Sequence, residues 1–261
     1  MFLGSLGIVG ILSAIATSKW KAQTGVQWAK WAAVTVVALG AFVTLHRASY
    51  FKDDFAFSRQ WLRSDPRSFN AHYNLGLALA REGRTEGAIT QYAEALEITP
   101  DHPQALNNLG SSLLEIGRVE KAILQFSKAL RVDADYADAH FNLGNALARQ
   151  NKNEEAIIHF QHAVRLVPGK ASFQNNLGNA LAATGRIDEA VGHFREAVRL
   201  QPDYAEAHNN LGVSLVSQGK LHEAVGQFNE ALRYQSNYED AQRNRQIVLL
   251  ELEKQQRVNR E

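Results

Sequence analysis

Five glycines stand at one fixed interval along this chain. Each lies 34 residues after the one before it, at Gly76, Gly110, Gly144, Gly178 and Gly212. A period of roughly 20 to 50 residues indicates that one small structural unit is stacked repeatedly, so that each unit contacts only its neighbours. We therefore expect a solenoid, because a globule with one closed core has no need of such a period.

Other residue types keep the same period and define the unit. In the first unit they are Leu75, Leu79, Ala88, Tyr92 and Ala95, and each has counterparts of the same or similar type at 34-residue steps. Spacings of three and four place these residues on one face of a helix, and two such runs occur in each unit. Each unit is therefore predicted to be a helical hairpin, with the aromatic residue filling the gap between one hairpin and the next.

A second periodic set predicts where the first helix of each unit ends. It consists of Gly83, Gly117, Gly185 and Gly219, with Asn151 in the middle unit. The residue after a helix often has a left-handed backbone, which glycine adopts freely and asparagine tolerates. The middle unit, where asparagine replaces this glycine, is predicted to open most readily.

These positions resemble the tetratricopeptide repeat, whose pattern reads NLG…A…F…A…P here over residues 69–236. His72, Leu106, His140, Gln174 and His208 stand where the family often has Trp. The resemblance implies an all-α fold, a right-handed superhelix (α-solenoid) of five helical hairpins whose first helices line a concave groove. The expected units are 69–102, 103–136, 137–170, 171–204 and 205–236, between a capping helix at 51–68 and a capping helix with a polar tail at 237–261.

Residues 1–50 are interpreted as a membrane segment with spans at about 2–18 and 28–46. Each apolar run is short for a span of roughly 17 to 25 residues unless the flanking tryptophans lie at the interface. One or two transmembrane helices, a re-entrant segment with one span, a cleaved signal ending near Ala16, and an interfacial or soluble apolar element all stay open. Basic residues on both sides of the second run leave the side of the membrane that carries the repeats undetermined.

The distribution of charge separates the two parts of the chain. Residues 1–68 hold eight Lys or Arg and three Asp or Glu, whereas 69–236 hold fifteen and nineteen. The basic part is suited to lie beside anionic lipid headgroups, and the lack of a basic stripe along the repeats argues against nucleic-acid binding. The chain has no cysteine, which excludes disulfides and thiol nucleophiles.

The sequence holds no recognisable catalytic motif, so we expect no enzymatic activity, no cofactor and no metal site. His159, His162 and His193 fall on predicted second helices. Because no carboxylate or further ligand is expected to converge on them, they are interpreted as solvated surface histidines. The buried positions in the place of Trp, which include three histidines, are interpreted as spacers.

A ladder of asparagines follows the 34-residue period, at Asn74, Asn108, Asn142, Asn176 and Asn210. A side-chain amide offers two donors and an acceptor, so such a ladder can hold the backbone of an extended peptide. The ladder resembles that of the repeat domain of the eukaryotic O-linked N-acetylglucosamine transferase. Asparagine is also frequent here in ordinary tetratricopeptides, where it fixes helix contacts, and this structural interpretation stays open. The other predicted groove residues are Asn107, Asn145, Asn175, Asn179 and Asn209, with Tyr73 and Phe141 as side-chain pockets.

Two functions follow as hypotheses. The first is a membrane-anchored scaffold or adaptor that binds an extended segment of a partner protein in its asparagine-lined groove. The second is the carboxyl-terminal repeat region of, or a partner to, a multispanning glycosyltransferase. This alternative rests on Tyr50 to Asp54, which resemble the linker before the first repeat in the TMTC-like family of membrane proteins.

Overall fold

The computed structural model of the protein describes residues 55–258. The chain divides into two units, residues 1–57 and 58–261, and the helical repeats lie in the second. Both runs interpreted as membrane spans lie outside the described residues. Within residues 55–258, no helix combines the length and the apolar character that crossing a membrane requires.

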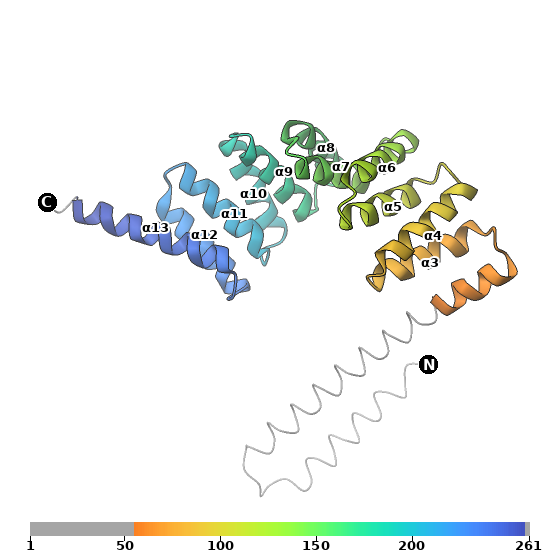
Figure 1. Cartoon of the computed structure of the whole chain (residues 1–261). Coiled ribbons are helices and arrows are strands. Elements are labelled where there is room, and N and C mark those ends of the chain that lie inside the picture. Colours follow the sequence, from red (N-terminus) through yellow and green to blue (C-terminus); the bar gives the residue numbers. More distant parts are fainter. Residues whose placement is uncertain (1–54, 259–261) are drawn as a thin grey trace, which may run out of the picture. The chain divides into compact units, whose positions relative to one another are not determined.

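The repeats form five consecutive helical hairpins (Figure 1). Their first helices are α3 (Phe69–Arg81), α5 (Pro103–Glu115), α7 (Ala137–Arg149), α9 (Ala171–Ala183) and α11 (Ala205–Ser217). Their second helices are α4 (Thr85–Ile98), α6 (Val119–Val132), α8 (Asn153–Leu166), α10 (Ile187–Leu200) and α12 (Leu221–Tyr234). Residues 55–64 are also helical and precede the first hairpin. The described residues are thus all-α, as the sequence predicts.

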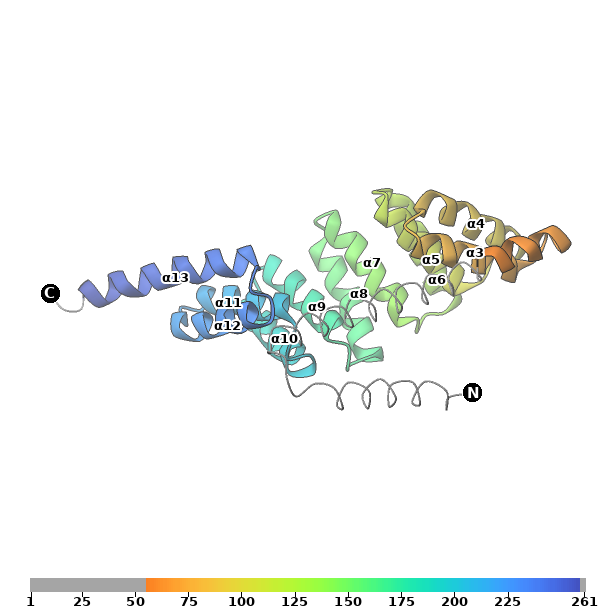
Figure 2. The ribbon, with the colours of Figure 1, turned by 90° about the horizontal axis from the view of Figure 1, so that it is seen from below.

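The last helix, α13 (Glu239–Val258), begins 34 residues after α11 and occupies the place of a sixth first helix. It packs against both α11 and α12, and it extends beyond them in both views of the ribbon (Figures 1 and 2). Neighbouring first helices contact one another from α5 through α13. These helices, with α3, therefore form one continuous surface, called here the first-helix face.

Each periodic aromatic residue packs on the periodic glycine of its own hairpin. Tyr92, Phe126, Phe160, Phe194 and Phe228 are all almost completely buried. A Cβ atom added to the glycine would lie only 2.5–2.7 Å from the nearest ring atom in every unit. The expectation that the ring fills the gap between hairpins is therefore corrected, because its closest partner belongs to the same hairpin.

The turns between paired helices confirm the prediction of left-handed residues. The glycines at 83, 117, 185 and 219 have φ values of 71° to 81°, and Asn151 has a φ of 59°. In each turn the next residue donates its amide to a carbonyl in the last turn of the first helix, as Lys152 does to Leu147 at 3.0 Å. The middle unit therefore keeps the geometry of its neighbours with a less suitable residue.

Replacing Asn151 with glycine is expected to raise the free energy of unfolding by about 0.5–1 kcal/mol, since glycine adopts positive φ without a Cβ penalty. Urea unfolding of the full chain, followed by circular dichroism, measures this change. The reverse substitution in the fourth unit, Gly185→Asn, is the matched control and should lower the free energy by a similar amount. A lower unfolding midpoint for Asn151→Gly would contradict the prediction.

Candidate functional site

The predicted asparagine ladder is a series of hydrogen bonds between successive first helices. Asn108 donates its amide to the hydroxyl of Tyr73 at 3.1 Å. One unit later, Asn142 donates to Asn107 Oδ1 at 2.9 Å and to Ser111 Oγ at 3.3 Å. The acceptors thus lie 35 or 31 residues before the donor, which places them on the preceding first helix.

The same geometry continues through the last two units. Asn176 donates to Asn145 Oδ1 at 2.7 Å. Asn210 donates to Asn175 Oδ1 at 3.2 Å and to Asn179 Oδ1 at 3.0 Å. We call each of these inter-unit bonds a rung, and every rung has its donor in the later unit.

The two ends of the ladder differ. On α13, Asn244 donates to Asn209 Oδ1 at 3.0 Å and adds a further rung. Asn74, in the first unit, is exposed, and among the described residues its side chain has no hydrogen-bond partner. Asn74 is therefore the one ladder residue in the described region that makes no rung.

Three of the predicted groove asparagines are buried between helices. Asn107, Asn175 and Asn209 are only 5%, 0% and 6% exposed. Asn175 donates to Glu206 Oε1 at 3.0 Å and to Asn176 Oδ1 at 3.3 Å while it accepts from the next unit. Buried amides need such partners, because an unsatisfied polar group costs the full desolvation penalty. The structure thus uses these side chains to join the units.

The two aromatic residues proposed as pockets also lie at joints between units. Tyr73 stacks on Phe69 with ring centroids 5.6 Å apart, and it contacts the ring of His102 at 5.5 Å. Phe141 stacks on Phe173 at 4.5 Å. Burial raises the pKa of Tyr73, so its hydroxyl stays protonated at neutral pH while it accepts from the ladder.

Replacing Asn142 with alanine is expected to lower the free energy of unfolding by about 0.5–1.5 kcal/mol, because two hydrogen bonds are lost and buried Asn107 loses its donor. The matched control is Asn74→Ala, which removes a ladder asparagine that makes no rung and should change the free energy by less than about 0.5 kcal/mol. Urea unfolding of both variants gives the comparison. Equal effects at the two positions would rule out a structural role for the rungs.

The carboxyl-terminal end of the first-helix face is apolar and exposed. Val213, Ile247 and Leu250 are 44%, 58% and 50% exposed. Val213 and Ile247 border a hollow of about 160 Å³ between α11 and α13, whose rim also includes Ser217 and Asn244. Sequence reasoning missed this feature. The available signal is one column at 34-residue steps that begins with Leu77, is polar at 111, 145 and 179, and is apolar at 213 and 247.

A second periodic set of contacts ties each first helix to its own second helix. In four units a ring nitrogen pairs across the hairpin, at an interval of 19 residues, with an amide oxygen or with a second ring nitrogen. The pairs are His72–Gln91 (3.0 Å), His140–His159 (3.1 Å), Gln174–His193 (2.8 Å) and His208–Gln227 (2.8 Å). The interpretation of His159 and His193 as solvated surface residues is therefore corrected, since both are half-buried and hydrogen-bonded.

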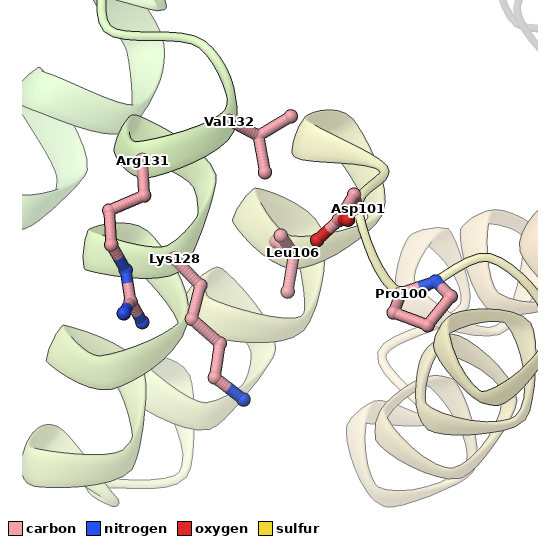
Figure 3. Close-up of a pocket in the computed structure, with 6 residues that line it drawn as sticks. All are labelled: Pro100, Asp101, Leu106, Lys128, Arg131 and Val132. Atoms are coloured by element: carbon pink, nitrogen blue, oxygen red, sulfur yellow. The ribbon is translucent and has the colours of Figure 1, made fainter.

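The second unit lacks such a pair and has a hollow of about 490 Å³ beside Leu106. Figure 3 shows Lys128 and Arg131 extending from one helix, with Asp101 and Pro100 in the loop across the hollow. These charged side chains are all exposed, so the hollow offers no desolvated polar group to fix a ligand. Among residues 55–258, no three His, Asp or Glu side chains are arranged to hold a metal ion.

Comparisons with known proteins place this architecture in a family. Models of the tetratricopeptide repeat match residues 67–135, 107–171, 178–219 and 205–238. The chain is a tetratricopeptide repeat protein. No curated protein matches this tetratricopeptide repeat chain significantly.

Solved structures resemble the tetratricopeptide array over most of its length. YrrB, described as a tetratricopeptide protein with an unusual peptide-binding site, is 23% identical to this chain, with a TM-score of 0.61. The match covers 72% of this chain and 97% of the YrrB chain. MamA is 26% identical over 64% of this chain and 92% of its own, with a TM-score of 0.58. A thermophilic tetratricopeptide protein of Thermus thermophilus, TTC0263, is 26% identical over 70% and 100%, with a TM-score of 0.55. These likenesses agree with the repeat fold.

Proposed function

We propose that this tetratricopeptide repeat protein is a membrane-anchored scaffold whose first-helix face binds an extended segment of a partner protein. The observation that carries the proposal is the exposed apolar end of that face, formed by Val213, Ile247 and Leu250. Contiguous exposed apolar side chains with a polar rim are typical of interaction sites. No feature of residues 55–258 favours the glycosyltransferase alternative.

The shape of the partner segment follows from the arrangement of the accessible side chains. Asn179, Val213 and Ile247 follow one another at 34-residue steps on three successive first helices, and all three are exposed. A segment that contacts all of them has to run across several units, which favours an extended chain. Asn179 offers an amide for its backbone, and the hollow between α11 and α13 suits one aliphatic side chain.

A binding measurement with matched isoleucine variants tests this proposal. An array of twelve-residue peptides of random sequence is probed with the purified full chain, and the affinity of the selected peptides is then measured for two variants. Ile247→Asp places a charge at the apolar end, whereas Ile158→Asp places the same charge on α8, away from the first-helix face. The two isoleucines are 58% and 54% exposed, so both variants should fold.

We expect Ile247→Asp to weaken the binding of peptides with aliphatic residues at least about tenfold, since an apolar contact is replaced by a charge that must be desolvated. Ile158→Asp should leave the affinity unchanged. Equal affinities for the native chain and Ile247→Asp, or equal losses in the two variants, would exclude the apolar end as the binding site.

Membrane attachment rests on the apolar runs at about 2–18 and 28–46. Flotation of the full chain with phosphatidylcholine vesicles tests it, with Val37→Asp and Leu39→Asp combined in one variant. Each acidic residue at the centre of a span costs roughly 2.5–3.5 kcal/mol, so this variant should stay unbound. The control combines Leu124→Asp with Ile158→Asp, two exposed positions on second helices, and should float. Flotation of both variants would overturn attachment through the second run.

A further inference from the structure

The cross-helix pair in the middle unit is the only one among the four described pairs that joins two imidazoles. In the first and fifth units a histidine faces Gln91 or Gln227. A glutamine amide can present either its oxygen or its nitrogen. It can therefore accept from a charged histidine or donate to a neutral one, and the hydrogen bond survives either state. The pair of His140 and His159 can share one added proton, but it cannot keep its hydrogen bond when both rings are charged, because each ring then has only donors.

The hydrogen bonds of His140 fix the position of its proton. His140 Nε2 lies 3.0 Å from the carbonyl oxygen of Ala134, and a carbonyl only accepts, so Nε2 carries the hydrogen. The Nδ1 atoms of His140 and His159 lie 3.1 Å apart, which leaves room for one hydrogen between them. When both rings are neutral, His140 therefore accepts from His159. The bond is lost once both rings are charged, because both Nδ1 atoms then carry a hydrogen.

The third imidazole of the cluster lies next to both His140 and a guanidinium. His162 stacks on His140, with ring centroids 4.8 Å apart and an angle of 11° between the rings. Arg165 Nη2 lies 2.9 Å from His162 Nδ1. A guanidinium has only donors, so His162 Nδ1 accepts.

The other three units with a cross-helix pair place a carboxylate where the middle unit has this third imidazole. The residue 22 positions after the first member of the pair is Glu94, Glu196 or Glu230 in the first, fourth and fifth units, whereas it is His162 in the third. A carboxylate at this position is suited to compensate a charged histidine, and a further imidazole adds to the repulsion.

The neighbouring elements supply little compensation. Asp135, before α7, and Glu155, one turn before His159 on α8, are the two carboxylates that favour charging, and both are exposed. Toward α7, α6 presents apolar residues, Ala129 and Leu130, and α9 has no ionisable side chain. At the N-cap of α9, Lys170 is engaged with Asp138 at 2.8 Å. The cluster therefore has one adjacent guanidinium and only two exposed carboxylates to offset added positive charge.

Burial lowers the pKa of His140, and it lowers the pKa of His159 to about 4. For each ring, the neighbouring imidazoles lower the pKa further. An unfolded histidine has a pKa of about 6.5. The folded hairpin thus favours the neutral rings. The stability that the neutral rings contribute is fully present above about pH 6.5 and is lost as the pH falls from there toward 4.

We propose that the α7–α8 hairpin is a proton-sensitive joint that opens in mild acid and separates the array into its first two and last two units. The rungs give this opening a wider consequence. Asn142 on α7 donates to α5, and Asn145 on α7 accepts from α9. When α7 loses its place on α8, both rungs are broken, and the first-helix face is no longer continuous.

Hydrogen exchange of the full chain between pH 6.5 and 4.5, corrected for the intrinsic exchange rate, tests the joint. A pKa lowered from about 6.5 to about 4 predicts a loss of protection of at least about tenfold over this range. We expect this loss in the amides of α7 and α8. The amides of α11 and α12, held by the His208–Gln227 pair, are the internal control. A smaller loss is expected in α9 and α10, because burial also lowers the pKa of His193.

Two variants separate the cluster from a general effect of acid. His159→Gln installs the pair found in the first and fifth units and should reduce the loss in α7 and α8 to that of α11 and α12. His162→Glu installs the carboxylate found in the first, fourth and fifth units and should make the loss smaller, because a carboxylate raises the pKa of the adjacent histidines toward the unfolded value. The joint is excluded if native α7 and α8 lose no more protection than α11 and α12. It is also excluded if His159→Gln, folded at neutral pH, loses as much as the native chain.

Discussion

Replacing Phe160 with alanine is expected to lower the free energy of unfolding by about 3–5 kcal/mol. The ring is 1% exposed and packs on Gly144, where an added Cβ atom would lie 2.7 Å from it. It also contacts Phe141, with ring centroids 5.8 Å apart. Because glycine has no side chain to move into the space, the cavity left by the ring stays open, and the contacts of Phe141 on this side are lost.

Urea unfolding of the full chain measures this loss, and Ile158→Ala is the matched control on the same helix. Ile158 is 54% exposed, so its truncation should change the free energy by less than about 0.5 kcal/mol. A Phe160→Ala variant that lost less than about 1 kcal/mol would mean that the hairpin is not held by this ring.

Replacing Gly178 with alanine is expected to destabilise the protein by about 1–3 kcal/mol, although alanine is the better helix former by about 1 kcal/mol. The added Cβ atom would lie 2.6 Å from Cε1 of Phe194, whose ring is 1% exposed. The ring fills the space between the two helices, so the helices have to separate or the ring has to leave its rotamer.

Gly192→Ala on α10 is the control for helix propensity, because no atom lies within 4 Å of its added Cβ atom. This variant should be more stable than the native chain by up to about 1 kcal/mol. Phe194→Leu combined with Gly178→Ala should cost less than the sum of the two single changes, since the smaller side chain leaves space for the methyl group. Additive losses in this double-mutant cycle, or a stabilised Gly178→Ala, would show that the ring and the glycine are not in contact.

Periodicity predicts the helices and turns of this protein well, because each unit repeats the same local pattern. Asn151 stands in the middle unit where the unit before has Gly117, and both residues have the left-handed backbone of the turn. The sequence predicts this turn because its geometry depends only on neighbouring residues. The aromatic ring was assigned to the wrong gap for the opposite reason. Whether it packs within a hairpin or between hairpins depends on how the helices cross, and the period is the same in both cases.

The role of the ladder depends on the rotation between units, which the sequence does not contain. Asn142 is partly exposed on α7, so its position along the helix is compatible with binding a ligand or with contacting the preceding helix. Only the three-dimensional arrangement shows that its amide lies within hydrogen-bond distance of Asn107 and Ser111. The sequence does contain a signal for the histidine pairs. The 19-residue interval between His140 and His159 recurs in three other units, where it separates a histidine from a glutamine. Reading the two helices of a hairpin as paired columns would have revealed it.

The place of α13 sets a limit on how far the array can be extended. Arg245 and Gln246 lie 34 residues after Leu211 and Gly212, and they line an open hollow of about 530 Å³ beside Leu232. In the five hairpins, the leucine and glycine at these places receive the second helix and its aromatic ring. The ring packs where the glycine has no Cβ atom, so a glutamine at that place would clash with it, and the arginine would place a charge beside it. A second copy of the chain therefore has no docking register here that copies the internal one, and end-to-end growth into a filament by this packing is blocked.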